Sequence, residues 1–312
     1  MATEVEKQLA RQPYFDLNAH VKSVLITYKA GPKLDKIVTV QAGYVDICNK
    51  PDVHGTAVSL PGSPGSHNDI KYMRDWFEKH NIRLVCTNWP GSEFVTGGLR
   101  DSYTNAERNS YMLALFEKLE LKKVEKLVLI GHSRGGESAL QMASILSVSR
   151  QRLNGYEEET QRCRMCGNFY NDLVGLRVAD GKVSAAAILP MQTFAFEKQK
   201  EWVDDMRKKP WIRMFYAYGS KDFLVAESDS EGFATYFKGD HFVIHDRQES
   251  EETIPKIRAS YANGTQTVSA NFTNEGHYLQ KTCPEFLIQV VGALFEAGKV
   301  EGKQEEIAVN LE

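Results

Sequence analysis

One short stretch of the chain predicts its fold: Leu127-Val-Leu-Ile-Gly-His-Ser-Arg-Gly-Gly136. The residues 127–130 are apolar throughout, which is typical of a central parallel strand covered on both faces. They lead into a Gly-x-Ser-x-Gly pattern around Ser133, and a helix is predicted next, over 135–148. A serine on a tight turn between strand and helix has an exposed hydroxyl, and the helix dipole there favours negative charge developing on an attacked carbonyl. Ser133 is therefore a candidate nucleophile.

Strand and helix patterns alternate along the rest of the chain, which is typical of an α/β sheet. The residues 24–28 and 37–40 are β-branched and flank a Gly-Pro turn, so an antiparallel hairpin is expected, with 45–47 extending its second strand. Further strands are predicted over 56–60, 83–87, 185–189, 212–218, 241–245 and 267–271. Helices are predicted over 68–80, 102–121, 196–208 and 286–295, with a charged helical span after 245. We expect a mostly parallel, doubly wound sheet with any ligand at the carboxyl ends of its strands.

The length of 312 residues fits a single domain over 1–312. A polar stretch with little periodicity, 150–182, is predicted to be an insertion, and the charged residues 299–312 a flexible tail. The short segment between 189 and 212 leaves room for only a short lid over the site.

Composition excludes several classes of function. The 38 Lys and Arg against 41 Asp and Glu give a net charge of -3, which offers no overall attraction for nucleic acid. No apolar stretch approaches the length of a membrane span, and the first residues lack the features of a secretory signal. The five cysteines fit thiols in a reducing compartment, so a soluble, cytoplasmic protein is expected.

Neither a metal nor a cofactor is predicted. The pair Cys163 and Cys166 has the spacing of half a zinc site, but no second Cys-x-x-Cys or paired histidines accompany it. A glycine-rich phosphate loop after a strand is absent from the sequence as well.

Three motifs together resemble the α/β-hydrolase superfamily, in its serine-nucleophile branch. Besides 131–136, the loop Pro61-Gly-Ser-Pro-Gly-Ser66 with Asp69 resembles the His-Gly-x-Pro-Gly loop of that superfamily, and Asn88-Trp-Pro-Gly91 resembles its Asp-x-x-Gly turn. The combination most resembles an uncharacterised α/β-hydrolase group associated with nematodes. The resemblance implies hydrolysis by a catalytic triad in the chain order serine, acid, histidine.

The triad can also be sought from its chemistry. A serine hydroxyl is a poor nucleophile at neutral pH, so a histidine must take its proton and an acid must orient the imidazole. Of eight histidines only His241, His245 and His277 follow Ser133, and His277 lies in the loop before the terminal helix, where the resemblance implies the catalytic one.

The acid is predicted to be Asp222, in the turn Gly219-Ser-Lys-Asp222, which resembles the acid turn of the superfamily. The interval to His277 is longer than the superfamily usually shows, so Asp240 and Asp246 remain alternatives.

An oxyanion hole is expected from the backbone N–H groups of Ser63 and Arg134. Pro61 replaces the usual histidine of this loop, which removes a side chain that normally braces it. Asp69, Asn88 and Trp89 are interpreted as structural braces, and Glu137 as a helix-face carboxylate or a local partner of Arg134. The side chains of His132 and Arg134 could contact substrate.

The predicted function is a serine hydrolase, of the carboxylic-ester type, that cleaves an ester-type acyl bond of a small-molecule substrate through an acyl-enzyme. Thioester, amide and carbon–carbon bonds remain open. The alternative is a hydrolase-fold binding or scaffold protein that has lost turnover, favoured by Pro61 and by the long interval from Asp222 to His277.

Overall fold

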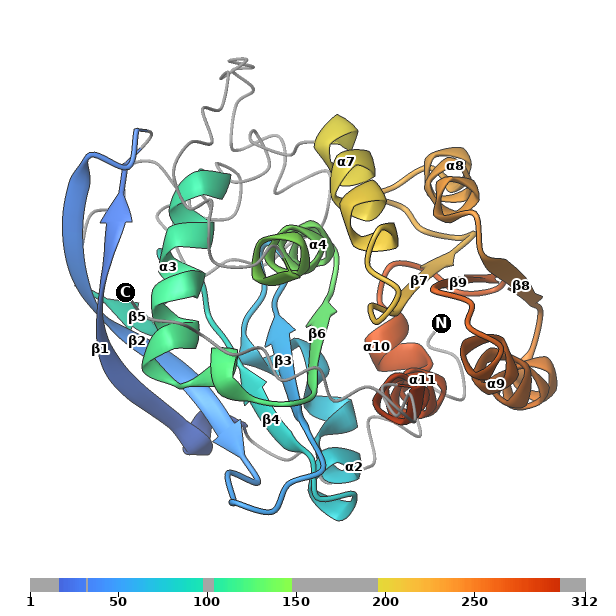
Figure 1. Ribbon diagram of the computed structural model, residues 1–312, viewed down its shortest axis with the longest axis horizontal. Coiled ribbons are helices and arrows are strands. Elements are labelled where there is room, and N and C mark those ends of the chain that lie inside the picture. The colour runs from blue at the N-terminus through green and yellow to red at the C-terminus, as the bar shows by residue number, and fades with distance from the viewer. Residues whose placement is uncertain (1–16, 32, 98–103, 148–195, 298–312) are drawn as a thin grey trace.

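A computed structural model describes residues 17–31, 33–97, 104–147 and 196–297 (Figure 1). The predicted insertion 150–182, with Cys163 and Cys166, the predicted strand 185–189 and the predicted tail 299–312 lie outside the described residues.

A six-stranded sheet holds the first half of the described chain, in the order β1-β2-β4-β3-β6, with β5 paired to β2. Its strands are β1 Val21–Ala30, β2 Lys36–Ile47, β3 Thr56–Leu60, β4 Arg83–Cys86, β5 Val95–Thr96 and β6 Leu127–Gly131. β1 and β2 form the predicted antiparallel hairpin, while β3 runs parallel to both β4 and β6. In this last pair Leu60 lies opposite Gly131, so the loops that follow β3 and β6 emerge side by side.

A second sheet of three parallel strands has the order β7-β9-β8, with β7 Met214–Gly219, β8 Asp240–Ile244 and β9 Thr267–Phe272. Gly219 lies opposite Phe272, so the loops after β7 and β9 also leave from one edge.

The helices are α2 Arg74–Lys79, α3 Asn105–Lys118, α4 Arg134–Ser147, α7 Phe196–Arg207, α8 Glu227–Phe237, α9 Arg247–Ala262, α10 Leu279–Thr282 and α11 Pro284–Ala297. Three short 3₁₀ helices, Leu17–His20, His67–Met73 and Leu121–Lys123, complete the described elements.

Helices cover both faces of the six-stranded sheet, because neighbouring strand residues point to opposite sides. Val85 packs in one core with Met112 of α3 and Met142 of α4, whereas Leu84 packs in the opposite core with Phe77 of α2. Figure 1 shows α3 and α4 together in front of the sheet. Helix α11 contributes to the cores of both sheets and so joins them. The predicted α/β class with a mostly parallel sheet is confirmed.

Some details differ from the predicted elements. The helix expected over 68–80 is divided into a 3₁₀ helix and α2, because Ile70 has non-helical backbone angles. β6 is only partly buried, and among the described strands it pairs with β3 alone. Helix α8 has no counterpart among the predicted elements. Within the described ranges, no helix is both long and apolar enough to cross a membrane.

Candidate active site

Ser133 stands on a tight turn between β6 and α4. Its φ of 53° lies in the left-handed region, which costs a residue with a Cβ about 1–2 kcal/mol. The turn is closed by hydrogen bonds of 2.8 Å from Gly135 N to the His132 carbonyl and from Gly136 N to the Ser133 carbonyl. Ser133 is exposed, so this strained turn presents its hydroxyl to solvent.

The loop after β3 lies directly against this turn. A Cβ on Gly135 would stand 2.0 Å from the carbonyl oxygen of Leu60, so only glycine allows the two backbones to pass. On the other side of the turn, a Cβ on Gly62 would lie 3.4 Å from Cβ of Ser133. The Pro-Gly loop that was expected to supply an oxyanion donor therefore adjoins the serine.

This loop is braced even though Pro61 stands where the resemblance has a histidine. Asp69 accepts hydrogen bonds from Gly62 N at 2.8 Å and from Ser66 N at 3.1 Å. Trp89 Nε1 donates to the carbonyl of Pro61 at 2.8 Å. Ser63, the oxyanion donor expected from this loop, lies between these anchored residues. Arg134, the other expected donor, is the first residue of α4. Asp69 and Trp89 thus take up the bracing that a histidine would provide.

Asp222 and His277 are brought together by the loops that follow β7 and β9. Lys221 N donates to the carbonyl of Glu275 at 2.9 Å. The backbones approach so closely that a Cβ on Gly219 would stand 2.3 Å from the same oxygen. The two loops consequently position the acid and the histidine as one unit.

Both oxygens of the Asp222 carboxylate accept hydrogen bonds in this unit. Oδ2 lies 2.7 Å from Nδ1 of His277, and Oδ1 accepts hydrogen bonds from the backbone N–H groups of Leu224 and Val225 at 2.7 and 3.1 Å. The side chains of His277 and Asp222 are only 8% and 10% exposed. Burial lowers the pKa of His277 below its ordinary value, and the hydrogen bond that His277 donates to Asp222 opposes this shift. The imidazole is therefore held by a carboxylate and kept neutral near pH 7, as a general base requires.

The other candidate acids and histidines are occupied elsewhere. Asp246 caps α9 by accepting a hydrogen bond from Glu249 N at 2.9 Å, and Asp240 faces the hydroxyl of Thr265 at 3.4 Å. His241 and His245 contact the hydroxyls of Ser269 and Thr273. Of the three aspartates considered, only Asp222 is hydrogen-bonded to His277.

His132 connects the serine turn to both neighbouring loops. Its Nε2 lies 3.2 Å from the carbonyl oxygen of His277, and its Nδ1 lies 3.4 Å from Oδ2 of Asp69. Both partners accept hydrogen bonds, so a neutral imidazole can donate to only one of them at a time. No hydrogen bond joins the Ser133 hydroxyl to His277 within the described residues, and in free enzymes such contacts often close only when substrate binds.

Behind the serine turn lies a buried ionic cluster. The side chains of Arg134 and Glu137 are fully buried and in contact, and Asn105 of α3 bonds to both, its Nδ2 donating to Glu137 at 3.1 Å. The predicted pairing of Glu137 with Arg134 is confirmed, whereas the hypothesis that the Arg134 side chain could contact substrate is wrong, since that side chain points into the protein. Sequence reasoning missed Asn105, because nothing at the start of a helix indicates a partner on α4.

We expect Glu137→Ala to lower the free energy of unfolding by about 3–5 kcal/mol, because it leaves the Arg134 charge buried without its carboxylate. Arg108 adds to the cost: burial and then Arg134 already lower its pKa, and Glu137 counteracts them. Urea denaturation measures the change. The matched control is Glu117→Ala, which removes a 77% exposed partner of Lys122 and should cost at most about 1 kcal/mol. Equal losses in both variants would contradict the role given to burial.

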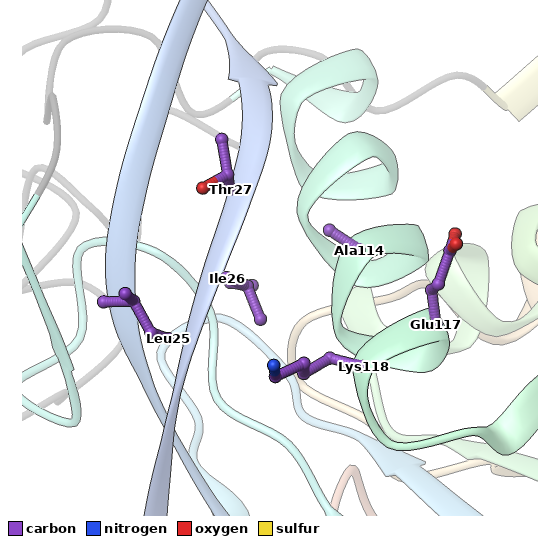
Figure 2. A pocket seen from close by; sticks show the side chains of 6 residues that line it. All are labelled: Leu25, Ile26, Thr27, Ala114, Glu117 and Lys118. Carbon is purple, nitrogen blue, oxygen red and sulfur yellow. The ribbon is translucent and has the colours of Figure 1, made fainter.

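A hollow of about 230 Å³ lies between β1 and α3, away from Asp222 and His277. Figure 2 shows its lining: Leu25, Ile26 and Thr27 from β1, and Ala114, Glu117 and Lys118 from α3. It contains neither a histidine nor an activated nucleophile, so we do not assign the active site there. Among the described side chains, no group of three or more His, Cys, Asp or Glu is arranged to hold a metal ion.

Comparisons with known proteins show the family to which the chain belongs. Residues 20–155 and 160–296 match the model of a family described as "Alpha/beta hydrolase of unknown function (DUF1057)". The chain is 50% identical over 321 residues to the uncharacterized protein F35H12.5 of Caenorhabditis elegans, covering 92% of this chain and 90% of that protein.

The solved structures that share this fold belong to proteins with different names. A thermophilic esterase from Thermogutta terrifontis matches with a TM-score of 0.53 and 13% identity over 89% of this chain and 99% of its own. A bromoperoxidase from Bacillus anthracis matches with a TM-score of 0.55 and 13% identity over 88% of this chain and 100% of its own. At such identities the likeness establishes the fold alone.

Proposed function

Because the chain belongs to the α/β-hydrolase family of unknown function matched above, we propose that it is a serine hydrolase cleaving an ester-type acyl bond through an acyl-enzyme. The observation that carries the proposal is the contact of 2.7 Å between Asp222 and His277, on loops that touch the exposed Ser133 turn through His132. Among the solved structures with this fold is an esterase, and an ester is the acyl bond that we propose and test first.

Ser133, His277 and Asp222 divide the steps of the reaction between them. Ser133 Oγ attacks the ester carbonyl while His277 takes its proton, and Asp222 holds the imidazole with Nδ1–H toward itself. The backbone N–H groups of Ser63 and Arg134 stabilise the oxyanion, and His277 then protonates the departing alcohol. Water, deprotonated by the same histidine, attacks the acyl carbonyl, and His277 returns that proton to Ser133 Oγ as the acid leaves.

One observation favours the second candidate, a binding protein without turnover: Ser133 and His277 are not hydrogen-bonded among the described residues. Intact-mass analysis after treatment with a fluorophosphonate separates the two candidates. A hydrolase gains one adduct, located by peptide mapping to Ser133, and loses it in His277→Ala. A folded protein that gains none is not a serine hydrolase.

The pH dependence of kcat/KM should follow the ionisation of His277 in the free enzyme. Only the neutral imidazole accepts the serine proton, so activity rises with pH through the His277 pKa and is then constant. Burial lowers that pKa, which places the midpoint below the ordinary 6.5. Initial rates with an uncharged ester, measured from acidic to neutral pH, test this, and a midpoint above 6.5 would contradict the buried environment assigned to His277.

A further inference from the structure

Three consecutive large apolar residues follow the candidate triad acid, and they lie on the surface. Phe223 is 60% exposed, and Leu224 and Val225 are each 37% exposed. Tyr278, directly after His277, is 38% exposed. We call these four residues the Phe223 patch; none of them belongs to a hydrophobic core of the described chain.

The patch is fixed in place by the acid itself. Asp222 Oδ1 accepts the backbone N–H groups of Leu224 and Val225, so the turn that orients His277 also holds these side chains outward. Apolar side chains in contact with water have an unfavourable hydration free energy, and burying them removes this cost. An apolar cluster that persists at the surface is typical of a ligand site.

Two aromatic rings of the patch lie beside His277. The Phe223 ring is centred 6.1 Å from the His277 ring and 6.3 Å from the Tyr278 ring, and Tyr278 is 5.3 Å from His277. These separations are those of interacting aromatic pairs. A group bound on the patch therefore lies beside the histidine that would act on the ester.

The charges nearby select against an anionic group. Burial, then Asp69, then Asp222 raise the pKa of Tyr278, which reports the negative potential of both carboxylates at this ring. Helix α8 adds the exposed Glu227 and Asp229 in its first turn. Lys221, which directly precedes Asp222, has its ammonium group 2.8 Å from Oδ1 of Asn274.

We propose that the Phe223 patch binds the acyl group of the substrate, and that the substrates are esters of uncharged alkyl or aryl carboxylic acids. This inference rests on the proposed function and adds the substrate class to it. The acyl chain lies across Phe223 and Tyr278 while its carbonyl carbon faces Ser133.

A series of p-nitrophenyl esters from acetate to hexanoate tests the proposal, with the hemisuccinate as the anionic member. If the patch covers half of the surface of the acyl chain, each added methylene should raise kcat/KM about twofold. The kcat/KM ratio of the hexanoate to the acetate should therefore be on the order of tenfold. The hemisuccinate should fall below the butyrate. Phe223→Ala and Leu224→Ser should each lower the hexanoate-to-acetate ratio to roughly threefold or less.

The matched control is Trp211→Ala. Trp211 is 66% exposed, like Phe223, but it precedes β7 by three residues and so lies at the end of that strand away from Asp222. This variant should keep the ratio of the wild type.

Two different failures can be told apart. If the wild type takes up a fluorophosphonate and hydrolyses the acetate, yet shows no rise with chain length or keeps its ratio in Phe223→Ala, the acyl site is wrong and the hydrolase stands. If the folded wild type takes up no fluorophosphonate and hydrolyses no ester, the proposed function fails, and the acyl site fails with it.

Discussion

Ser133→Ala should lower kcat for ester hydrolysis by roughly five to six orders of magnitude, the loss expected when a triad loses its nucleophile. The reason is chemical, since alanine leaves no oxygen to form the acyl-enzyme. The fold should be unaffected, because the residue keeps a Cβ at the same φ of 53° and the hydrogen bonds of the turn come from Gly135 and Gly136. Steady-state rates with a short-chain p-nitrophenyl ester give the measurement, and circular dichroism checks the fold.

The control for this variant is Ser228→Ala, an exposed serine in the first turn of α8. It should keep the rate of the wild type. A Ser133→Ala protein that retained a tenth or more of the rate would show that hydrolysis takes place elsewhere on the chain.

Asp222→Asn should lower kcat by about 10⁴-fold, the effect of removing the carboxylate while keeping the shape of a triad. The amide would offer an N–H where His277 Nδ1 needs an acceptor, and so favour the wrong tautomer. The same change removes the group that raises the pKa of His277, so the acid limb of the remaining activity should move to lower pH. A pH profile of kcat/KM separates these effects from simple unfolding, which would lower the rate at every pH alike.

Asp246→Asn is the matched control, and it tests the choice of acid. Asp246 caps α9, a position where asparagine serves as well as aspartate, so neither activity nor stability should change appreciably. If instead Asp246→Asn lost activity and Asp222→Asn kept it, the assignment of the triad acid would be overturned.

Much of the fold could be predicted because its strands have strong local signals. The β-branched hairpin, the apolar run before Ser133 and the terminal helix all appear where periodicity places them. Helix α8 was not predicted because its apolar residues Phe233, Ala234 and Phe237 come only after an acidic first turn and Gly232, which weakens the helical pattern. The apolar spacing reveals neither the break at Ile70 nor the capping box at Ser66 that begins the 3₁₀ helix.

The candidate site was less accessible from the sequence. Spacing alone could not choose among Asp222, Asp240 and Asp246, because the choice depends on β7 and β9 being neighbours in space. Likewise the contacts of His132 with the Asp69 and His277 loops join residues that are 63 and 145 positions apart. Such pairings are set by tertiary packing, which no short pattern encodes.

The most direct test of the central claim is to look for the acyl-enzyme itself. The wild type, mixed with p-nitrophenyl butyrate and quenched in acid within one turnover, should gain the mass of one butyryl group, on the peptide that carries Ser133. Ser133→Ala should gain none. Release of p-nitrophenol by the wild type without any butyryl mass on that peptide, or with the mass on another residue, would contradict the account.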